Sequence, residues 1–249
     1  MLIFGGDVLS GTTINANNYT VVVTGNNNGT INSTLTLSGS STLDFDSSTT
    51  EFNDFSNYLS NLNANSLLDY PNGTQHGEAK FNADSSVGIG LVVFNIDASE
   101  LFGNNLVQQY NLVLNNQSPS AVVINVAGEV ISDATMGNPV GGFNESNSDF
   151  MIWNFYQVLE INLNIQLHGS LLAPLATLST SNNIDGSVIE NDFEQNGEAH
   201  NNLFTGTITY DPISVVTAPT QPTAVPVPSS LLIFAAALFG FGVWRRRSA

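Results

Sequence analysis

The sequence predicts a mainly β protein, and three features of the chain indicate this fold class. The body is rich in Asn, Ser, Thr and Gly, and its apolar residues come in runs too short for long helices. Residues 159–167 alternate strictly between apolar and polar side chains, which is typical of a strand with one buried and one wet face. Glycine followed by a small hydroxyl residue also recurs along the chain. We expect strands at residues 19–24, 33–37, 90–96, 112–115, 121–127, 150–156, 159–167 and 204–210.

The recurring glycine pairs predict a right-handed β-solenoid. They are Gly11-Thr12, Gly29-Thr30, Gly169-Ser170, Gly186-Ser187 and Gly206-Thr207. The first two pairs are 18 residues apart, and the last three are separated by 17 and 20 residues. Such a period fits one coil of a solenoid, in which glycine permits a tight corner and small hydroxyl residues stack between coils. Chance recurrence in a glycine-rich sequence is the alternative.

One segment, residues 48–69, breaks the β pattern. Its apolar residues Phe52, Phe55, Leu59 and Leu62 fall at helical intervals, and Ser48 with Glu51 matches a capping box. We therefore expect one amphipathic helix along the flank of the solenoid, covering apolar surface that the coils leave open.

Three asparagines, Asn95, Asn125 and Asn154, each lie inside an apolar strand. A buried amide left without a partner costs about 1 to 3 kcal/mol, so these side chains need hydrogen bonds. We expect them to form a ladder between coils rather than to contact a ligand.

The C-terminal residues predict a membrane anchor. Residues 218–228 are rich in proline, threonine and small residues and read as a stiff spacer after a domain at 1–217. An apolar stretch at about 229–244 follows, and it ends at Arg245, Arg246 and Arg247. The positive-inside rule keeps these arginines in the cytoplasm, so the body would lie across the inner membrane.

Composition fits an exported domain that does not bind nucleic acid. Lys80 is the one basic residue before the tail, against 21 acidic residues, so the body carries a net charge of 1 − 21 = −20. Nucleic acid and anionic lipid would be repelled. The chain has no cysteine, so packing and hydrogen bonds must stabilise it. No charged and apolar signal segment opens the sequence, and Leu2 to Phe4 read as a strand, so we expect the natural N-terminus to lie upstream.

Few residues are candidates for chemistry. His76, His168 and His200 lack metal-ligand spacing, and neither a nucleophile elbow nor a phosphate loop is present. The sequence therefore predicts no catalytic residue, no cofactor and no dedicated metal site. Two acidic clusters could supply carboxylates to a structural calcium ion, although solvated loops are the simpler interpretation. They are Asp44, Asp46, Glu51 and Asp54, and Asp185, Glu190, Asp192, Glu194 and Glu198.

The tail resembles a PEP-CTERM sorting signal, the segment that exosortase systems of Gram-negative bacteria recognise. The residues that carry the resemblance are Val225, Pro226, Pro228, Ser229, Ser230, Arg245, Arg246 and Arg247. Val227 stands where the family usually has Glu. The resemblance implies processing by an exosortase-type enzyme at the inner membrane, followed by delivery to the cell surface or extracellular matrix.

The body, from about Phe4 to Tyr210, resembles the choice-of-anchor A family of bacterial surface domains regarded as adhesins. The matching segments are 4–7, 124–128, 152–155, 168–174, 183–186, 197–201 and 204–206. Leu175 departs from the asparagine that the family commonly has there. The order of helix and strands is also similar, more distantly, to ice-binding β-solenoid domains, which is an analogy of fold and not of ligand.

These observations favour an exported, non-catalytic surface or matrix protein that is adhesive and binds an exopolysaccharide or cell-surface glycan. Ice or ordered-surface binding is the first alternative, but Thr12, Thr30, Thr34 and Thr36 are few for a regular threonine face. A polysaccharide-active enzyme with paired carboxylates across a groove is the second.

Overall fold

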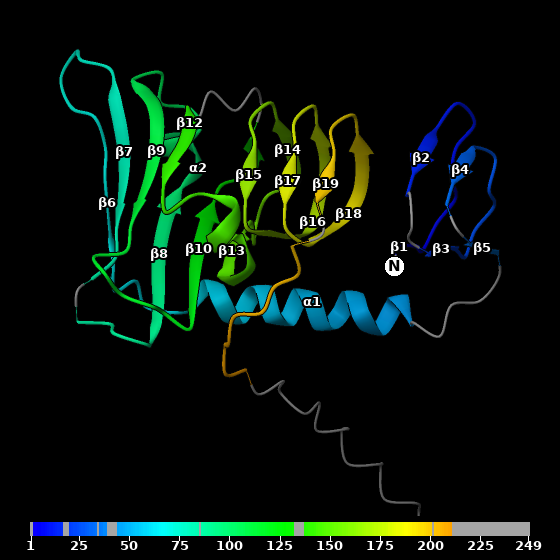
Figure 1. Cartoon of the computed structure of the whole chain (residues 1–249), viewed down its shortest axis with the longest axis horizontal. Coiled ribbons are helices and arrows are strands. Elements are labelled where there is room, and N and C mark those ends of the chain that lie inside the picture. Colours follow the sequence, from blue (N-terminus) through cyan, green and yellow to red (C-terminus); the bar gives the residue numbers. More distant parts are fainter. Residues whose placement is uncertain are drawn as a thin grey trace, which may run out of the picture. The chain divides into compact units, whose positions relative to one another are not determined.

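The structure is a computed structural model that describes residues 2–16, 20–33, 35–38, 44–84, 86–131, 137–200 and 202–210. These residues belong to one compact unit, Met1–Pro212, and most of its elements are strands (Figure 1). The strands are β1 (Leu2–Phe4), β2 (Thr13–Asn15), β3 (Thr20–Val23), β4 (Thr30–Asn32), β5 (Leu35–Ser38), β6 (Leu67–Asp69), β7 (Gly77–Asn82), β8 (Leu91–Asp97), β9 (Val107–Val113), β10 (Ala121–Ala127), β11 (Val130–Ile131), β12 (Asn138–Gly141), β13 (Met151–Asn154), β14 (Glu160–Leu163), β15 (Leu167–His168), β16 (Ser170–Thr180), β17 (Ile184–Asp185), β18 (Val188–Gln195) and β19 (Ala199–His200). The helices are α1 (Phe45–Ser60), α2 (Ala98–Leu101) and the 3-10 helix η1 (Glu145–Phe150).

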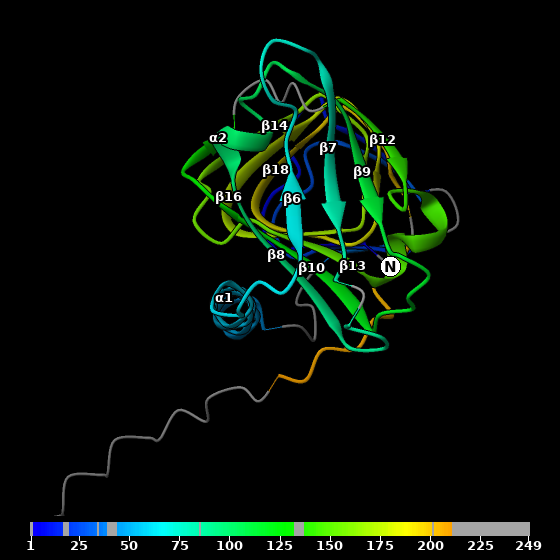
Figure 2. The same ribbon diagram turned by 90° about the vertical axis from the view of Figure 1, so that its left-hand side faces the viewer.

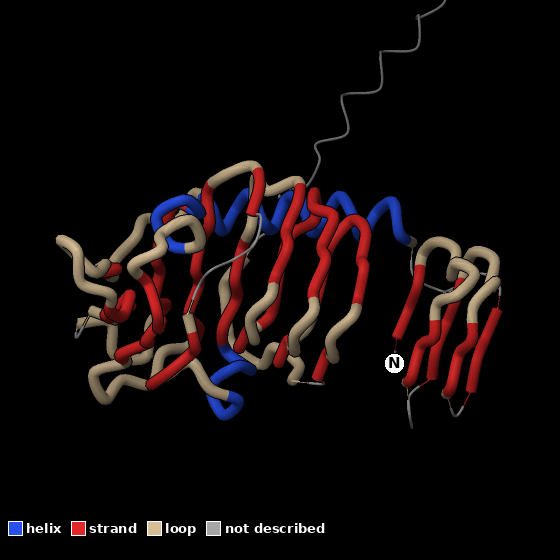
Figure 3. Tube along the Cα trace, turned by 90° about the horizontal axis from the view of Figure 1, so that it is seen from above, coloured by secondary structure: helices blue, strands red, loops and turns tan. Residues whose placement is uncertain are grey.

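Three parallel sheets of the main body wrap around one interior. The largest has the order β11-β14-β16-β13-β10-β8, with β18 also paired to β16. The second has the order β12-β9-β7-β6, and the third has the order β15-β17-β19. All of these pairs are parallel except β6 with β7. Figure 2 shows the strands curling around the interior, and Figure 3 shows them side by side along the body.

The N-terminal strands repeat this parallel arrangement on a smaller scale. They form the sheets β1-β3-β5 and β2-β4 around a small core of Val8, Ala16, Val21 and Val23. This part therefore has a core of its own.

Aromatic side chains fill the interior of the main body. Trp153 and Phe143 stack with ring centroids 5.6 Å apart, and Phe81 meets both rings edge-on. The polar ends are satisfied, because Trp153 Nε1 donates to His168 O at 3.0 Å and Tyr110 Oη to Gln166 O at 2.7 Å. Interdigitated rings with partnered polar atoms give this core a single arrangement.

The helix exists as predicted, but its boundaries differ. It begins at Phe45, because the Asp44 carboxylate accepts a hydrogen bond from Ser47 N at 3.2 Å and caps the first turn. The capping box predicted at Ser48 and Glu51 was therefore wrong, since both residues lie inside the helix. The helix ends at Ser60, and the end of the predicted range forms β6.

The predicted asparagine ladder is confirmed. Asn125 Nδ2 donates to Asn95 Oδ1 at 2.9 Å, and Asn154 Nδ2 donates to Asn125 Oδ1 at 2.8 Å. The three residues lie in register on β8, β10 and β13. Their side chains point away from the aromatic interior, toward α1.

Each asparagine of the ladder also donates to a carbonyl of the helical segment. Asn154 reaches Ser56 O at 2.9 Å, Asn125 reaches Leu59 O at 2.7 Å and Asn95 reaches Leu62 O at 3.1 Å. Ser56 and Leu59 lie three residues apart in α1, which is a rise of about 4.5 Å, and Leu62 follows just after the helix ends. Neighbouring strands are about 4.8 Å apart, which is close to this helical rise. Successive asparagines on neighbouring strands can therefore reach successive carbonyls along the helical segment.

The predicted strand at 204–210 is not a strand. Residues 202–210 form an extended strap that makes single hydrogen bonds, among them Thr205 N to Asp149 O at 2.6 Å and Thr207 N to Ser120 O at 2.9 Å. The Tyr210 ring lies 5.1 Å from that of Phe55, so the end of the strap packs on α1. Extended backbone here serves to hold the helix and not to extend a sheet.

The predicted strand at 159–167 is interrupted. It consists of β14 and β15, separated by a corner at residues 164–166. Alternation of apolar and polar residues continues through the corner because Leu163 and Leu167 both point into the interior.

The glycine-containing corners pack closely on one another. Gly169 has a φ of 113°, a conformation that side chains other than glycine rarely adopt. A Cβ on Gly186 would lie within 2.5 Å of the Gly169 carbonyl carbon, so the two corners stack with backbone against backbone. In the N-terminal part, a Cβ on Gly29 would lie 2.7 Å from Thr12 O. The pairs at Gly29, Gly169 and Gly186 therefore mark positions where backbone must approach closely.

The structure thus confirms a mainly β fold with a flanking helix. The right-handed β-solenoid itself stays a prediction, because the described strands form a curled, largely parallel sheet. Among the residues that the structure describes, no helix has the length and apolar character needed to cross a membrane. The predicted transmembrane segment at about 229–244 lies outside the described residues.

Candidate functional site

The predicted sorting-signal residues also lie outside the described part of the chain. They are Val225, Pro226, Pro228, Ser229, Ser230, Arg245, Arg246 and Arg247. The candidate sites with a described structure therefore lie in the body.

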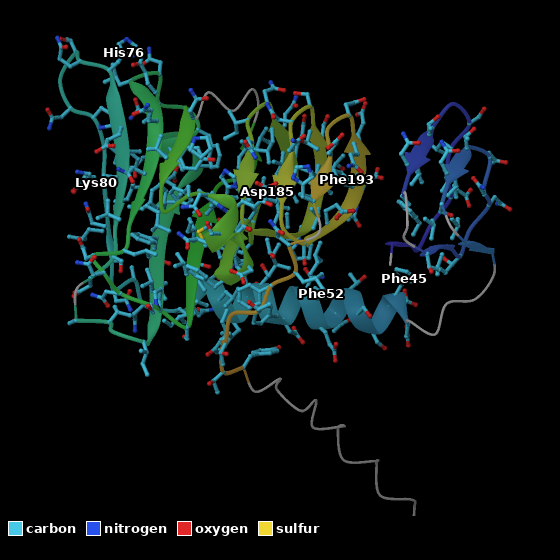
Figure 4. The ribbon with its side chains drawn as sticks, in the orientation of Figure 1. Phe45, Phe52, His76, Lys80, Asp185 and Phe193 are labelled. Atoms are coloured by element: carbon cyan, nitrogen blue, oxygen red, sulfur yellow. The ribbon has the colours of Figure 1, made fainter. Side chains whose placement is uncertain are left out.

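A polar hollow of about 700 Å³ lies where β7, β9 and β12 begin. Its lining consists of His76, Gly77, Glu78, Asn105, Val107, Gln108, Gln109, Gly137 and Asn138. In Figure 4, His76 lies at the end of the loop that joins β6 to β7, directly before β7. The parallel register places Glu78, Gln109 and Asn138 in one row across the three strands. Each residue of this row points outward, because the next residues, Ala79 and Tyr110, are buried.

One side of this hollow is fixed by hydrogen bonds. Glu78 Oε2 accepts from Asn111 Nδ2 at 3.1 Å, and Glu78 Oε1 lies 3.3 Å from Lys80 Nζ. The hydrogen bond from Asn111, followed by that from Lys80, lowers the pKa of the Glu78 carboxyl. The carboxylate is therefore held in its ionised form as a hydrogen-bond acceptor.

The densest group of titratable side chains is a ladder on β15, β17 and β19. His168, Asp185 and His200 occupy the same register position on these three strands. Asp185 is 2% exposed, and its two carboxylate oxygens lie 2.6 Å from His168 Nδ1 and 2.5 Å from His200 Nδ1. Gln166 Nε2 adds a hydrogen bond to Asp185 Oδ2 at 3.0 Å. The buried Asp185 carboxylate therefore connects the three neighbouring strands β15, β17 and β19 and has a structural role.

The exposed end of this ladder is His200. Its Nε2 lies 3.2 Å from Glu198 Oε2. The hydrogen bond to Glu198, and after it the interaction with Asp185, raises the pKa of the His200 imidazole. The imidazole rings of His168 and His200 lie against the carboxylates of Asp185 and Glu198.

The two predicted acidic clusters do not converge. In the first, Asp44 caps α1 and Asp46, Glu51 and Asp54 are exposed along that helix. In the second, Asp185 is tied to the histidines and Glu198 to His200 alone, whereas Asp192 and Glu194 point outward from β18. The described residues contain no group of three or more His, Asp or Glu side chains that could hold a metal ion.

A second, acidic hollow of about 430 Å³ is lined by Glu145, Ser146, Asp149 and Asn202. Two of its residues make hydrogen bonds within the protein. Asp149 Oδ2 accepts from Thr205 Oγ1 at 3.0 Å, and Asn202 Nδ2 donates to Ser148 Oγ at 3.0 Å. This hollow is part of the attachment of the strap.

Two edge strands of the largest sheet, β8 and β18, differ in how their edges are protected. At β8 the Asn65 side chain acts as a strand substitute, with Nδ2 donating to Leu91 O at 2.8 Å and Oδ1 accepting from Val93 N at 2.9 Å. At β18 the only strand partner within the described ranges is β16. Glu190 of β18 pairs with the buried Ala173, and its side chain points inward. An inward charge on an end strand discourages unwanted strand pairing.

Sequence reasoning did not identify the polar hollow or the inward position of Glu190. The hollow is assembled from segments about 30 residues apart, and its Asn and Gln residues look like those of any polar loop. The segment Val188-Ile189-Glu190 carries the signal for Glu190. Side chains alternate along a strand, so Glu190 lies on the same face as Val188, two residues earlier.

Comparison with known families agrees with the sorting-signal resemblance of the tail and gives an adhesive-domain family for the body. Residues 224–247 match the PEP-CTERM protein-sorting motif, which indicates an exported protein that is a substrate for exosortase processing. No curated protein and no solved structure matches the chain. Neither matching family is a catalytic one. Residues 1–201 of the 249 match the family described as "Putative Ice-binding-like adhesive domain". The chain therefore belongs to this family of ice-binding-like adhesive domains.

Proposed function

We propose that the protein is an exported, non-catalytic adhesive protein of a Gram-negative bacterial surface or extracellular matrix. One observation carries the proposal: a single chain joins an adhesive-domain family at residues 1–201 to a sorting motif at residues 224–247. The finer affiliation of the body with the choice-of-anchor A family is part of the same proposal.

We further infer a topology for delivery. The apolar segment at about 229–244 would hold the chain in the inner membrane, with Arg245, Arg246 and Arg247 in the cytoplasm and the body outside. An exosortase-type enzyme would then process the tail and release the body to the cell surface or matrix. The body, read as a right-handed β-solenoid, suits this destination because the chain has no cysteine and a large apolar core stabilises the body.

Sorting is tested by changing the arginines of the tail. Replacement of Arg245, Arg246 and Arg247 together by alanine is expected to reduce processed, surface-located protein at least tenfold, because the positive end that fixes orientation is lost. Cell fractionation with intact mass and C-terminal peptide mapping measures the result. Lys80→Ala, which removes the one basic residue of the body, is the control and should leave sorting unchanged. Unaltered processing of the triple variant would contradict the proposed signal.

Adhesion is tested by attachment of cells. A strain that lacks the protein is expected to attach to polysaccharide-coated surfaces several-fold less than its parent, and the full-length chain should restore attachment. Equal attachment of the two strains, together with no binding of the purified protein to any glycan, would refute the adhesive function.

Ice binding is the second candidate, and one structural feature favours it. On the sheet β2-β4, Thr13 pairs with Thr30 and Asn15 pairs with Asn32, and all four residues are exposed. The result is a small, regular polar array. Thermal hysteresis above that of a buffer control would support this candidate, and hysteresis equal to the control would remove it.

A further inference from the structure

We propose that the polar hollow at the start of β7, β9 and β12 binds a neutral sugar residue of a glycan chain. This inference rests on the proposed adhesive function and assigns it a site and a class of ligand.

The lining offers free hydrogen-bonding groups in one place. The side chains of His76, Asn105, Gln108, Gln109 and Asn138 surround the hollow, and none of them makes a hydrogen bond to a described residue. Many other amides of this protein are occupied internally, as in the asparagine ladder. A side-chain amide provides both donors and an acceptor, which matches a sugar hydroxyl that donates and accepts.

Part of the lining forms a regular row across β7, β9 and β12. Glu78, Gln109 and Asn138 follow one another at the spacing of neighbouring strands, about 4.8 Å. Glu78 is fixed by Asn111 and Lys80, so one acceptor of the row is already positioned before a ligand arrives. Rigid strands under the row reduce the ordering cost of binding.

Charge selects neutral sugars over acidic ones. The body carries 21 acidic residues against Lys80, and Lys80 is paired with Glu78 at the edge of this hollow. A uronate or sulfated sugar would approach a negative field with no free cation in the lining. Because the lining contains no Phe, Tyr or Trp ring on which a sugar could stack, each site would bind weakly. Adhesion would then depend on many copies on one surface.

The test uses the full-length purified protein and a glycan array that carries neutral oligosaccharides, uronate-containing chains and sulfated chains. We expect binding to neutral oligosaccharides alone. Gln109→Ala and Asn138→Ala are each expected to weaken that binding at least tenfold. Asn191→Ala, which removes an exposed amide on β18, should have no effect. Unfolding midpoints equal to that of the parent protein establish that the variants are folded, and both changed side chains of the hollow are exposed.

The outcomes separate this site from the adhesive function. Binding to neutral glycans that survives both Gln109→Ala and Asn138→Ala would overturn the site while leaving adhesion in place. A preference for acidic chains would also overturn it, because the charge argument would then be wrong. If cells attach through the protein but no glycan on the array is bound, the sugar assignment fails and the adhesive function stands.

Discussion

Asn125→Ala is expected to lower the free energy of unfolding by about 3 kcal/mol. The side chain is 1% exposed, and it makes three hydrogen bonds, to Leu59 O, to Asn95 Oδ1 and from Asn154 Nδ2. Each hydrogen bond contributes about 1 kcal/mol, and Asn154, which is fully buried, would be left with an unpaired donor. The loss also removes the central link between α1 and the sheet.

Urea unfolding of the full chain measures this effect, with Asn95→Ala as the matched control. Asn95 belongs to the same ladder and donates to Leu62 O, but its side chain is exposed, so water can replace the lost contacts. We expect Asn95→Ala to cost about 1 kcal/mol or less. Equal losses for the two variants would mean that the ladder does not hold the helix.

The ladder shows what could be predicted from the sequence and what could not. Asn95, Asn125 and Asn154 each interrupt an apolar strand, and the cost of an unpaired amide was enough to predict that they bond to one another. The role of α1 in the same network could not be predicted. It depends on the agreement between a three-residue helical rise and the strand spacing, which becomes visible only when both elements are placed.

The start of α1 shows how two local signals compete. Ser48 and Glu51 form a sequence pattern for a capping box, yet Asp44 caps the helix because its carboxylate reaches Ser47 N and Ser47 Oγ. Helix periodicity fixed the element and its buried stripe, whereas the position of the cap required backbone geometry. Helix ends are generally the least certain part of such a prediction.

The polar hollow lay beyond sequence reasoning for a different reason. The hollow is lined by residues from three strands that are far apart in the sequence. Only the parallel register of β7, β9 and β12 brings Glu78, Gln109 and Asn138 together. No local motif marks them, because the row runs across the strands. The tail, in contrast, is a local signal, and its residues could be identified by order and composition alone.

Glu190→Gln is expected to stabilise the protein above neutral pH by about 2 kcal/mol and to have little effect at pH 4. Burial first, and then repulsion by Asp192, raises the pKa of the Glu190 carboxyl from 4.5 to about 7. A shift of this size corresponds to a free-energy difference of about 3 kcal/mol between the two protonation states. Because the side chain is partly exposed, screening by solvent reduces the expected effect to about 2 kcal/mol.

The direction of the pH dependence follows from linkage. The folded protein binds this proton more tightly than the unfolded chain, so the contribution of Glu190 is fully present below pH 4.5. It is lost as the pH rises from 4.5 to about 7, where the folded carboxyl ionises. A glutamine side chain at this position cannot ionise, so urea unfolding between pH 4 and 8 should show a flatter profile for the variant.

Two variants on the same strand identify the cause. Glu194→Gln removes an exposed, outward carboxylate of β18 and should leave the slope of stability against pH unchanged between 4.5 and 7. Asp192→Asn removes the repelling neighbour and should move the midpoint of that slope to lower pH. If Glu190→Gln follows the parent profile, the carboxyl is solvated. The end strand would then not carry an inward charge, and the protection of that edge would need another explanation.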